Sequence, residues 1–465
     1  MSVVILLVAL GLLMLVAYRG YSVILFAPIC ALLAVLATDP ALVAPAYTSV
    51  FMDRLANFVK LYFPVFMLGA VFGKVIELSG FSKAIVSSIV RMVGPSRAML
   101  SIVLVCAVMT YGGVSLFVVV FAVYPFAAEL FRQVNIPKRL IPGTIALGAF
   151  TFTMDALPGT PQIQNIIPTT FFQTNTWAAP WLGVVGAVFI FITGMTYLEF
   201  MRRRAAASGE GYALEGQRLE NEPEPFEDEK LPNAALAILP LILVFVLNRV
   251  FTDAIPALYG ETFQFALGNE PPTAIAIAKI AAIWAVIGAL IVGILSVVVT
   301  SFRTISGRFA DGTKLAIAGA LLATLNTASE YGFGGVVAAL PGFEVVRAGL
   351  EAIPNPLINE AVTVTVLAGI TGSASGGMSI ALAAMADQFI ANANAAGIPL
   401  EVLHRVASMA SGGMDTLPHN GAVITLLAVT GLTHRQSYKD IFAITIIKTL
   451  AVGVIIAFYY LTGIY

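Results

Sequence analysis

The scarcity and the clustering of charged residues constrain this chain more than any other feature of its sequence. Its 465 residues include 25 basic and 26 acidic side chains, or 11% of the chain, and 13 of these lie between residues 202 and 232. Soluble domains carry about 25% charged residues, and they need polar side chains to cover their surface. The sequence therefore predicts an integral membrane protein with one polar linker near its middle.

Other classes of protein are excluded on similar grounds. The net charge is −1 and no basic stripe is present, so nucleic acid is not an expected partner. The two cysteines lie in apolar runs, so a disulfide framework is not expected. The first eighteen residues are apolar but lack a basic start and a cleavage site, and we interpret them as a retained membrane span.

Apolar segments long enough to cross a bilayer recur along the chain. A membrane-spanning helix needs about 20 apolar residues. The candidates are 2–18, 22–38, 57–79, 98–131, 139–165, 180–200, 233–252, 273–300, 315–340, 358–393, 400–428 and 441–462. Two of them, 98–131 and 358–393, have double length.

The basic residues indicate an orientation. With the linker in the cytoplasm, 17 of the 25 lysines and arginines fall inside the cell and five fall outside, Arg405 among these five. Lys74, Lys279 and Lys448 lie within spans, near their ends. This bias is the one that the positive-inside rule describes. We therefore expect the linker to be cytoplasmic and both termini to lie outside.

Two short motifs recur in the second half of the chain. Met154–Pro158 returns as Met414–Pro418 at an offset of 260, and Gly112–Ser115 returns as Gly376–Ser379 at an offset of 264. The orientation given above places the two halves in opposite directions across the membrane. Inverted repeats with interrupted spans are typical of secondary transporters, although an old duplication retained only for packing is an alternative.

The expected fold is therefore an all-α polytopic membrane protein built from two inverted-topology repeats. The first repeat covers 1–201, a cytoplasmic polar linker covers 202–232, and the second repeat covers 233–465. Each repeat should contain one helical hairpin and one discontinuous transmembrane helix.

The double-length segments are interpreted as hairpins. Each is apolar except around Thr110–Ser115 or Thr371–Ser379, where paired glycines favour a tight reversal. A tip inside the membrane requires surrounding protein or a water-filled cavity, and two complete spans joined by a tight turn are the alternative. Small-residue helix packing could also account for the glycines. The candidate substrate-binding residues here are Gly112, Gly113, Ser115, Ser375, Gly376, Gly377 and Ser379.

The discontinuous helices are expected at Asp155–Gln162 and Ser411–Gly421, because prolines there remove backbone donors. Each break contains a carboxylate, Asp155 or Asp415, which is costly in hydrocarbon. These acids are candidates for ion coupling or, alternatively, for helix N-caps. Further candidate substrate-binding residues are Pro158, Gly159, Thr160, Thr416, Pro418, His419 and Asn420.

A third polar stretch, Asn326–Gly335, is expected to interrupt span 315–340 and contains Glu330. The corresponding span of the first half has no acid at mid-depth. We therefore rank the ion-coupling candidates as Glu330, Asp415 and Asp155. A structural acid paired with a hydroxyl or with Lys279 is the alternative for Glu330.

The substrate class follows from the charges near the breaks. No arginine or lysine is expected at any break, so an anion would be bound by helix N-termini, hydroxyls and amides. This arrangement suits a small monocarboxylate better than a citrate-like trianion. Co-transport of one proton would make the movement of a monoanion electroneutral.

At these residues the chain resembles the gluconate:proton symporter (gluconate permease) family of the ion transporter superfamily. The resemblance covers nearly the full length and is strongest over Tyr111–Phe117 and Thr151–Asn165. It implies re-entrant hairpins, elevator-like alternating access and a homodimer in the bacterial inner membrane. Family substrates include gluconate, D-serine and 3-hydroxybutyrate, and this chain looks closer to the 3-hydroxybutyrate branch. Asp155 departs from the family pattern, because an uncharged residue is expected there in gluconate carriers.

The expected function is secondary active, proton-coupled symport of a small organic acid anion such as gluconate or 3-hydroxybutyrate. A sodium-coupled carboxylate symporter is one alternative, and a channel is another. An enzyme is not expected, because the chain has no His-Glu-x-x-His pair and its histidines are scattered. No metal site and no cofactor are expected beyond the coupling ion, H+ or alternatively Na+.

Overall fold

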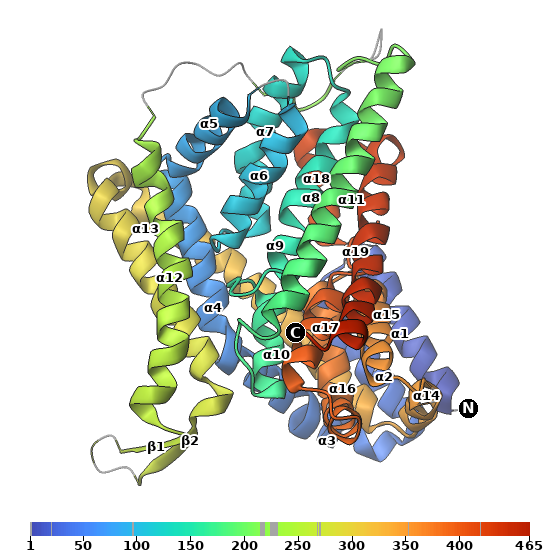
Figure 1. Cartoon of the computed structure of the whole chain (residues 1–465). Coiled ribbons are helices and arrows are strands. Elements are labelled where there is room, and N and C mark those ends of the chain that lie inside the picture. The colour runs from blue at the N-terminus through green and yellow to red at the C-terminus, as the bar shows by residue number, and fades with distance from the viewer. Residues whose placement is uncertain are drawn as a thin grey trace.

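The computed structural model consists almost wholly of helices (Figure 1). It describes residues 2–19, 21–94, 97–213, 219–223, 231–266, 268, 271–351, 353–418 and 420–465.

The part before the linker contains eleven α-helices and three shorter helical segments within the described residues. Their order is α1 (Ser2–Tyr18), α2 (Val23–Thr38), η1 (Pro40–Leu42), α3 (Val43–Ala46), η2 (Tyr47–Phe51), α4 (Met52–Leu78), α5 (Phe81–Val93), α6 (Ala98–Tyr111), α7 (Leu116–Gln133), η4 (Lys138–Leu140), α8 (Ile141–Ala149), α9 (Phe152–Asp155), α10 (Ile163–Phe172) and α11 (Pro180–Ala207).

The part after the linker adds eight α-helices and one small sheet within the described residues. Their order is α12 (Ala234–Tyr259), β1 (Thr262–Phe265), β2 (Thr273–Ala276), η5 (Ile277–Lys279), α13 (Ala281–Ala339), α14 (Pro341–Glu351), α15 (Pro356–Thr371), α16 (Ala374–Ala395), α17 (Leu400–Ser411), α18 (Gly421–Thr430) and α19 (His434–Thr462).

Six helical stretches of the described chain are long and apolar enough to cross a membrane. They are Pro40–Leu78, Leu116–Gln133, Pro180–Ala207, Ala234–Tyr259, Ala281–Ala339 and His434–Thr462. The remaining apolar helices are shorter, and α6 has 14 residues. At 1.5 Å per residue α6 is about 21 Å long, which is less than the hydrocarbon thickness of about 30 Å. This length favours a re-entrant first hairpin.

Both predicted hairpins are present. The first joins α6 to α7 through a turn at Gly113, whose φ of +98° suits glycine. The second joins α15 to α16 through Gly372, with a φ of +64°. In Figure 1 the first hairpin lies in the half of the molecule nearest the linker and the second lies in the opposite half. This placement is the one expected of inverted repeats, while the repeat boundaries themselves stay a prediction.

Both predicted breaks are present as well. Helical structure ends at Asp155 and resumes at Ile163 in the first half, and it ends at Ser411 and resumes at Gly421 in the second. The two broken helices lie together, because α10 packs against both α16 and α17. The peptide groups at the breaks are thus surrounded by protein from both halves of the chain.

The predicted interruption at Asn326–Gly335 is wrong. α13 is continuous to Ala339, and Ser301 is its one non-helical residue. The glycines allow close packing instead of a break: a side chain at Gly332 would crowd Phe51, and one at Gly334 would crowd the Ile380 backbone. Span 273–300 also differs from the prediction, because β2 occupies its start and pairs antiparallel with β1.

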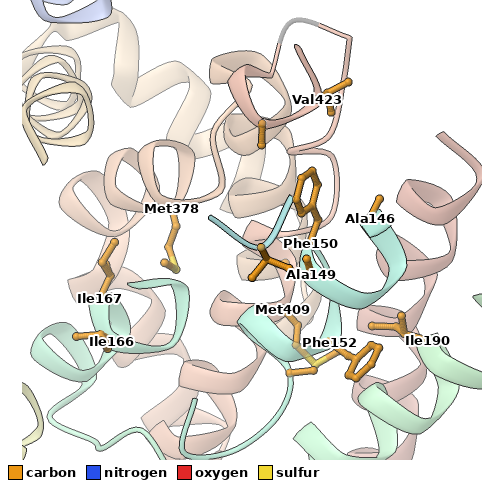
Figure 2. Close-up of a cluster of buried hydrophobic side chains, with 14 of the residues drawn as sticks. Ala146, Ala149, Phe150, Phe152, Ile166, Ile167, Ile190, Met378, Met409 and Val423 are labelled. Carbon is orange, nitrogen blue, oxygen red and sulfur yellow. The ribbon is translucent and has the colours of Figure 1, made fainter. Parts of the chain in front are cut away.

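Apolar packing between the breaks holds the two halves together. Figure 2 shows Phe150 and Phe152, at the end of α8 and the start of α9, beside Met409 of α17 and Val423 of α18. All four side chains are buried. Close packing of this kind fixes the relative position of the two breaks.

Candidate functional site

A single cavity of about 680 Å³ receives residues from both halves of the chain. Its volume lies within the range of about 300–1,000 Å³ that small-molecule sites occupy. Of the residues predicted from sequence, the cavity wall contains Gly113, Ser115, Ser375, Thr416, Asn420, Glu330 and Asp415. Both hairpin tips and the second break therefore meet at one space.

Glu330 lies in this wall on α13, and its side chain is only 3% exposed. The Ser373 hydroxyl, at the second hairpin tip, donates a hydrogen bond to its carboxylate. The other carboxylate oxygen, Oε2, lies against Gly376 and has no hydrogen-bond partner among the described residues. On the same face of α13, the Thr327 hydroxyl lies 3.3 Å from the Ser375 hydroxyl.

Asp415 is held by a lysine that the sequence analysis had not placed at the site. The Lys448 ammonium on α19 lies 2.9 Å from Asp415 Oδ1 and donates a 2.7 Å hydrogen bond to the Phe150 carbonyl. The two side chains are only 1% and 6% exposed, for Lys448 and Asp415 respectively. Lys448 therefore joins the second break directly to the end of α8, which precedes the first break.

A buried arginine holds the first break. Arg405 of α17 has no exposed surface, and its guanidinium donates to the Asp155 carbonyl at 3.0 Å and to the Ala178 carbonyl at 2.8 Å. The same group donates to Asn165 Oδ1 at 3.0 Å. One sequence expectation is thus wrong, because basic residues do sit at the breaks. Arg405, counted above among the residues on the outer side, is buried within the protein. Backbone carbonyls freed by the break replace water as its partners.

Asp155 is also buried, at 1% exposure, but it does not line the cavity. Its Oδ2 has no hydrogen-bond partner among the described residues. A side chain at Gly412 would overlap both this oxygen and Lys448. Neither Asp155 nor Asp415 is the N-cap of a helix that follows a break, because Gln162 occupies that position for α10 and Asn420 for α18.

Three predicted residues of the first break form its own framework outside the cavity wall. The Pro158 carbonyl accepts a 2.7 Å hydrogen bond from the Tyr111 hydroxyl. Gly159 has a φ of +78°, and its carbonyl accepts from Asn248 at 2.9 Å. Thr160 donates to the Thr153 carbonyl at 2.8 Å. These groups fix the shape of the break.

Four other predicted residues, Gly112, Gly377, Ser379 and Pro418, also pack away from the cavity wall. Gly112 lies against Leu241 of α12, and Gly377 lies against the α15 backbone at Ala368. Ser379 is fully buried, and the Pro418 carbonyl accepts from His434 at 2.9 Å. Asn420 both lines the cavity and caps α18 through its side-chain oxygen. The prediction for His419 lies outside the described residues.

Sequence reasoning missed Lys448, Arg405 and a further acid, Glu360 of α15. Glu360 has no exposed surface, and neither of its carboxylate oxygens has a hydrogen-bond partner in the described part of the chain. One signal in the sequence could have found Lys448: it stands alone in the long apolar run that follows Ile441. A cation there needs a buried partner.

The described part of the linker docks on the molecule. Glu222 pairs with Arg132 and, at 2.7 Å, with Lys138, while Glu210 pairs with Arg139 at 2.6 Å. Partial burial acts to raise the pKa of Glu222, but hydrogen bonds from Lys138 and Arg132 outweigh it and hold the pKa below its ordinary value. This part of the linker is therefore fastened by charge.

Comparison with known proteins identifies the class of this molecule. No family model matches the chain. Over 472 aligned residues, covering 100% of both chains, it is 60% identical to a Bacillus subtilis (strain 168) protein named uncharacterized transporter YxjC. The chain belongs to the family of YxjC. It is a multi-pass membrane transporter with a bacterial relative, and not an enzyme.

A solved structure shares the fold of this chain. The YdaH transporter of Alcanivorax borkumensis superposes with a TM-score of 0.55, covering 90% of this chain and 88% of that chain, at 14% identity. This likeness confirms the predicted all-α, multi-span transporter architecture. The predicted placement in the gluconate permease family stays a proposal.

The groups at the cavity that could bind an ion are carboxylates and hydroxyls. Within the described residues, no group of three or more histidine, cysteine, aspartate or glutamate side chains is placed to hold a metal ion.

Proposed function

We propose that this YxjC-family transporter is a secondary active, proton-coupled symporter of a small organic acid anion, such as gluconate or 3-hydroxybutyrate. The supporting observation is the cavity in which both hairpin tips, the second break and Glu330 meet. The resemblance to gluconate:proton symporters supports the substrate class. The same resemblance supports a homodimer in the bacterial inner membrane with a cytoplasmic linker and outside termini.

An anionic substrate has a binding surface at the start of α7. The N-cap residue, Ser115, makes no side-chain cap, and residues 115–118 all line the cavity. The first backbone N–H groups of a helix attract anions when no cap satisfies them. The hydroxyls of Ser115, Ser375 and Thr416 and the amide of Asn420 complete the proposed substrate contacts, together with the neighbouring glycines of the two tips.

Glu330 is the proposed proton carrier. It lines the cavity, has no cationic partner among the described residues, and has one oxygen without any hydrogen bond. An ionised carboxylate is costly to bury without a cationic partner, so a proton that arrives with the substrate would be bound here. A proton taken up with a monoanion would leave the loaded carrier without added charge. Asp415 takes part in coupling through its ion pair with Lys448, and Asp155 through its place beside that pair.

Sodium coupling is the alternative, because the hydroxyls near Glu330 could act as ligands for a sodium ion. Thr327, Ser373 and Ser375 gather oxygen atoms beside the carboxylate, and oxygen ligands suit hard cations. A sodium gradient would then replace the pH gradient as the driving force.

Uptake by purified protein in liposomes tests the proposal. Hydroxy acids are scanned under an imposed pH gradient and then under a sodium gradient. We expect saturable uptake of a small monocarboxylate that follows the pH gradient and ignores sodium. Uptake driven by sodium alone would establish the alternative, and absence of gradient-driven uptake for every acid tested would refute coupled acid transport.

Two substitutions locate the coupling groups. Glu330→Gln should abolish gradient-driven uptake but retain exchange of substrate across the membrane, because the amide cannot carry a proton. Asp415→Asn should also abolish gradient-driven uptake, because it removes the carboxylate partner of Lys448. Asp311→Asn is the matched control, since Asp311 is 91% exposed on α13. Full uptake by both test variants would remove these acids as coupling groups.

A further inference from the structure

Lys448 occupies an unusual position for a cation. It lies on α19, within the longest apolar run after the second break, and is 2% exposed. Its ammonium contacts the Phe150 carbonyl, between α8 and α9, at 2.7 Å and Asp415, at the second break, at 2.9 Å. An ammonium with this little exposure persists only where buried anions or carbonyls compensate for its lost hydration.

Two carboxylates lie close to this one ammonium, and one of them is paired with it. Asp415 pairs with it directly. Asp155 Oδ2 lies beside it, because a Cβ atom placed on Gly412 would overlap Asp155 and come within 3.0 Å of Lys448 Nζ. Arg405 directs its guanidinium to the Asp155 carbonyl and not to either carboxylate oxygen. Lys448 is therefore the cation that faces both acids of the breaks.

The carboxylates of the cavity wall differ in what balances them. Glu77 pairs with Lys74 at 2.7 Å, and Asp415 pairs with Lys448 at 2.9 Å. Glu330 alone, among the carboxylates of the described wall, has no basic partner. Asp415 and Glu330 thus line the same space, but only Glu330 is left to bind a cation that arrives through it.

We propose that Lys448 is a tethered counter-ion that prevents Asp415 from binding a soluble cation and so sets the coupling ratio at one ion per substrate. Lys448 is a positioning residue, because it acts through Asp415 and does not line the cavity. This inference rests on the proposed coupled symport. Removing the ammonium should leave Asp415 exposed to the cavity as a second site for the coupling ion.

The electrical character of uptake measures this ratio. One proton with one monoanion moves no net charge, whereas two protons with one monoanion move one positive charge. Wild-type protein in liposomes should therefore accumulate a monocarboxylate independently of a membrane potential set by potassium and valinomycin. Lys448→Met should become electrogenic, with uptake stimulated by an interior-negative potential. Lys448→Arg keeps the charge and should stay electroneutral.

A double variant separates charge balance from a role in holding the breaks together. Lys448→Met combined with Asp415→Asn removes both charges and should return uptake to electroneutrality. It should also transport more than Asp415→Asn alone, in which the ammonium has lost its direct partner. If the Lys448–Asp415 pair only held the breaks together, neither result would be expected, because the double variant has lost both partners of the pair.

The outcomes are distinct from those that test the function. Electroneutral uptake by folded Lys448→Met would overturn the counter-ion role while leaving coupled symport intact. Should that variant fail to fold, the comparison of Asp415→Asn with the double variant decides: equal or lower uptake in the double variant overturns the role. Wild-type protein without gradient-driven uptake of any acid would overturn coupled symport itself, and this inference with it.

Discussion

The Tyr111 hydroxyl donates a 2.7 Å hydrogen bond to the Pro158 carbonyl, and this contact ties the tip of the first hairpin to the first broken helix. The carbonyl needs such a partner because the chain leaves its helix at Asp155 and resumes it only at Ile163. Movement of the hairpin tip would therefore displace the backbone at the break. We call this contact the joint. The hairpin tip and the first break that it connects both contribute to the cavity wall, through Gly113 and Gln162.

Tyr111→Phe should destabilise the joint. It removes one hydrogen bond and leaves the Pro158 carbonyl without this donor, which lowers the stability by about 1 kcal/mol. We expect a lower melting temperature in detergent and a smaller maximal uptake rate, because the hairpin tip loses its fixed position. Tyr460→Phe is the control, since Tyr460 is 49% exposed on α19. Equal effects of the two substitutions would contradict a specific role for the joint.

Gly376→Ala should disturb the coupling group without touching its charge. A Cβ at Gly376 would overlap the Glu330 carboxylate. Overpacking in a closely packed site costs about 1–3 kcal/mol, so we expect the Glu330 carboxylate to be displaced and gradient-driven uptake to fall. The control is Gly453→Ala on α19, where a Cβ meets nothing within 4 Å. Wild-type uptake by Gly376→Ala would show that Glu330 does not need this position.

Arg405→Met should affect folding more than transport chemistry. The variant leaves the Asp155 and Ala178 carbonyls and Asn165 without their buried cationic donor. Each buried acceptor left without its donor costs about 1–3 kcal/mol. We expect little folded protein, measured by monodispersity and thermal unfolding in detergent. Retained folding with a normal melting temperature would show that the break holds its shape without Arg405.

Glu222→Gln should weaken the docked linker in a pH-dependent way. The folded pKa of Glu222 is lowered from its ordinary value of 4.5, because Lys138 and Arg132 outweigh the opposing effect of burial. A lowered folded pKa contributes stability above the ordinary value, and the contribution disappears as the pH falls through the lowered one. The substitution should therefore cost about 1 kcal/mol at neutral pH and little in strong acid. Thermal unfolding across this range measures the difference, and a pH-independent effect would contradict the pairing.

Part of the site could be predicted because polar residues in apolar spans are informative. Ser115, Ser375, Thr416, Asn420, Asp415 and Glu330 all reach the cavity wall. The prolines and glycines at 158–161 and 412–413 likewise indicated the breaks, since they interrupt the backbone hydrogen bonds of a helix. Local chemistry of this kind acts within a few residues and is visible in the sequence.

Other features depended on neighbours distant in the sequence. Asn326–Gly335 contains glycines typical of a break, but the helix continues because Phe51 and Ile380 pack closely against it. Pro158, Gly159 and Thr160 belong to a break, yet their polar groups form hydrogen bonds with other residues of the protein and do not line the cavity. Whether a glycine marks a turn or a close contact is decided by what lies opposite it.

The sequence by itself determined the membrane setting, the order of the spans, the two hairpins and the two breaks, because hydrophobicity and proline act locally. Only the tertiary structure decided which charges meet. Lys448 pairs with the Asp415 carboxylate across 33 residues, and the Arg405 guanidinium reaches the backbone carbonyl of Asp155 across 250. Buried charges must find partners wherever the fold brings them, and no local pattern records that partner.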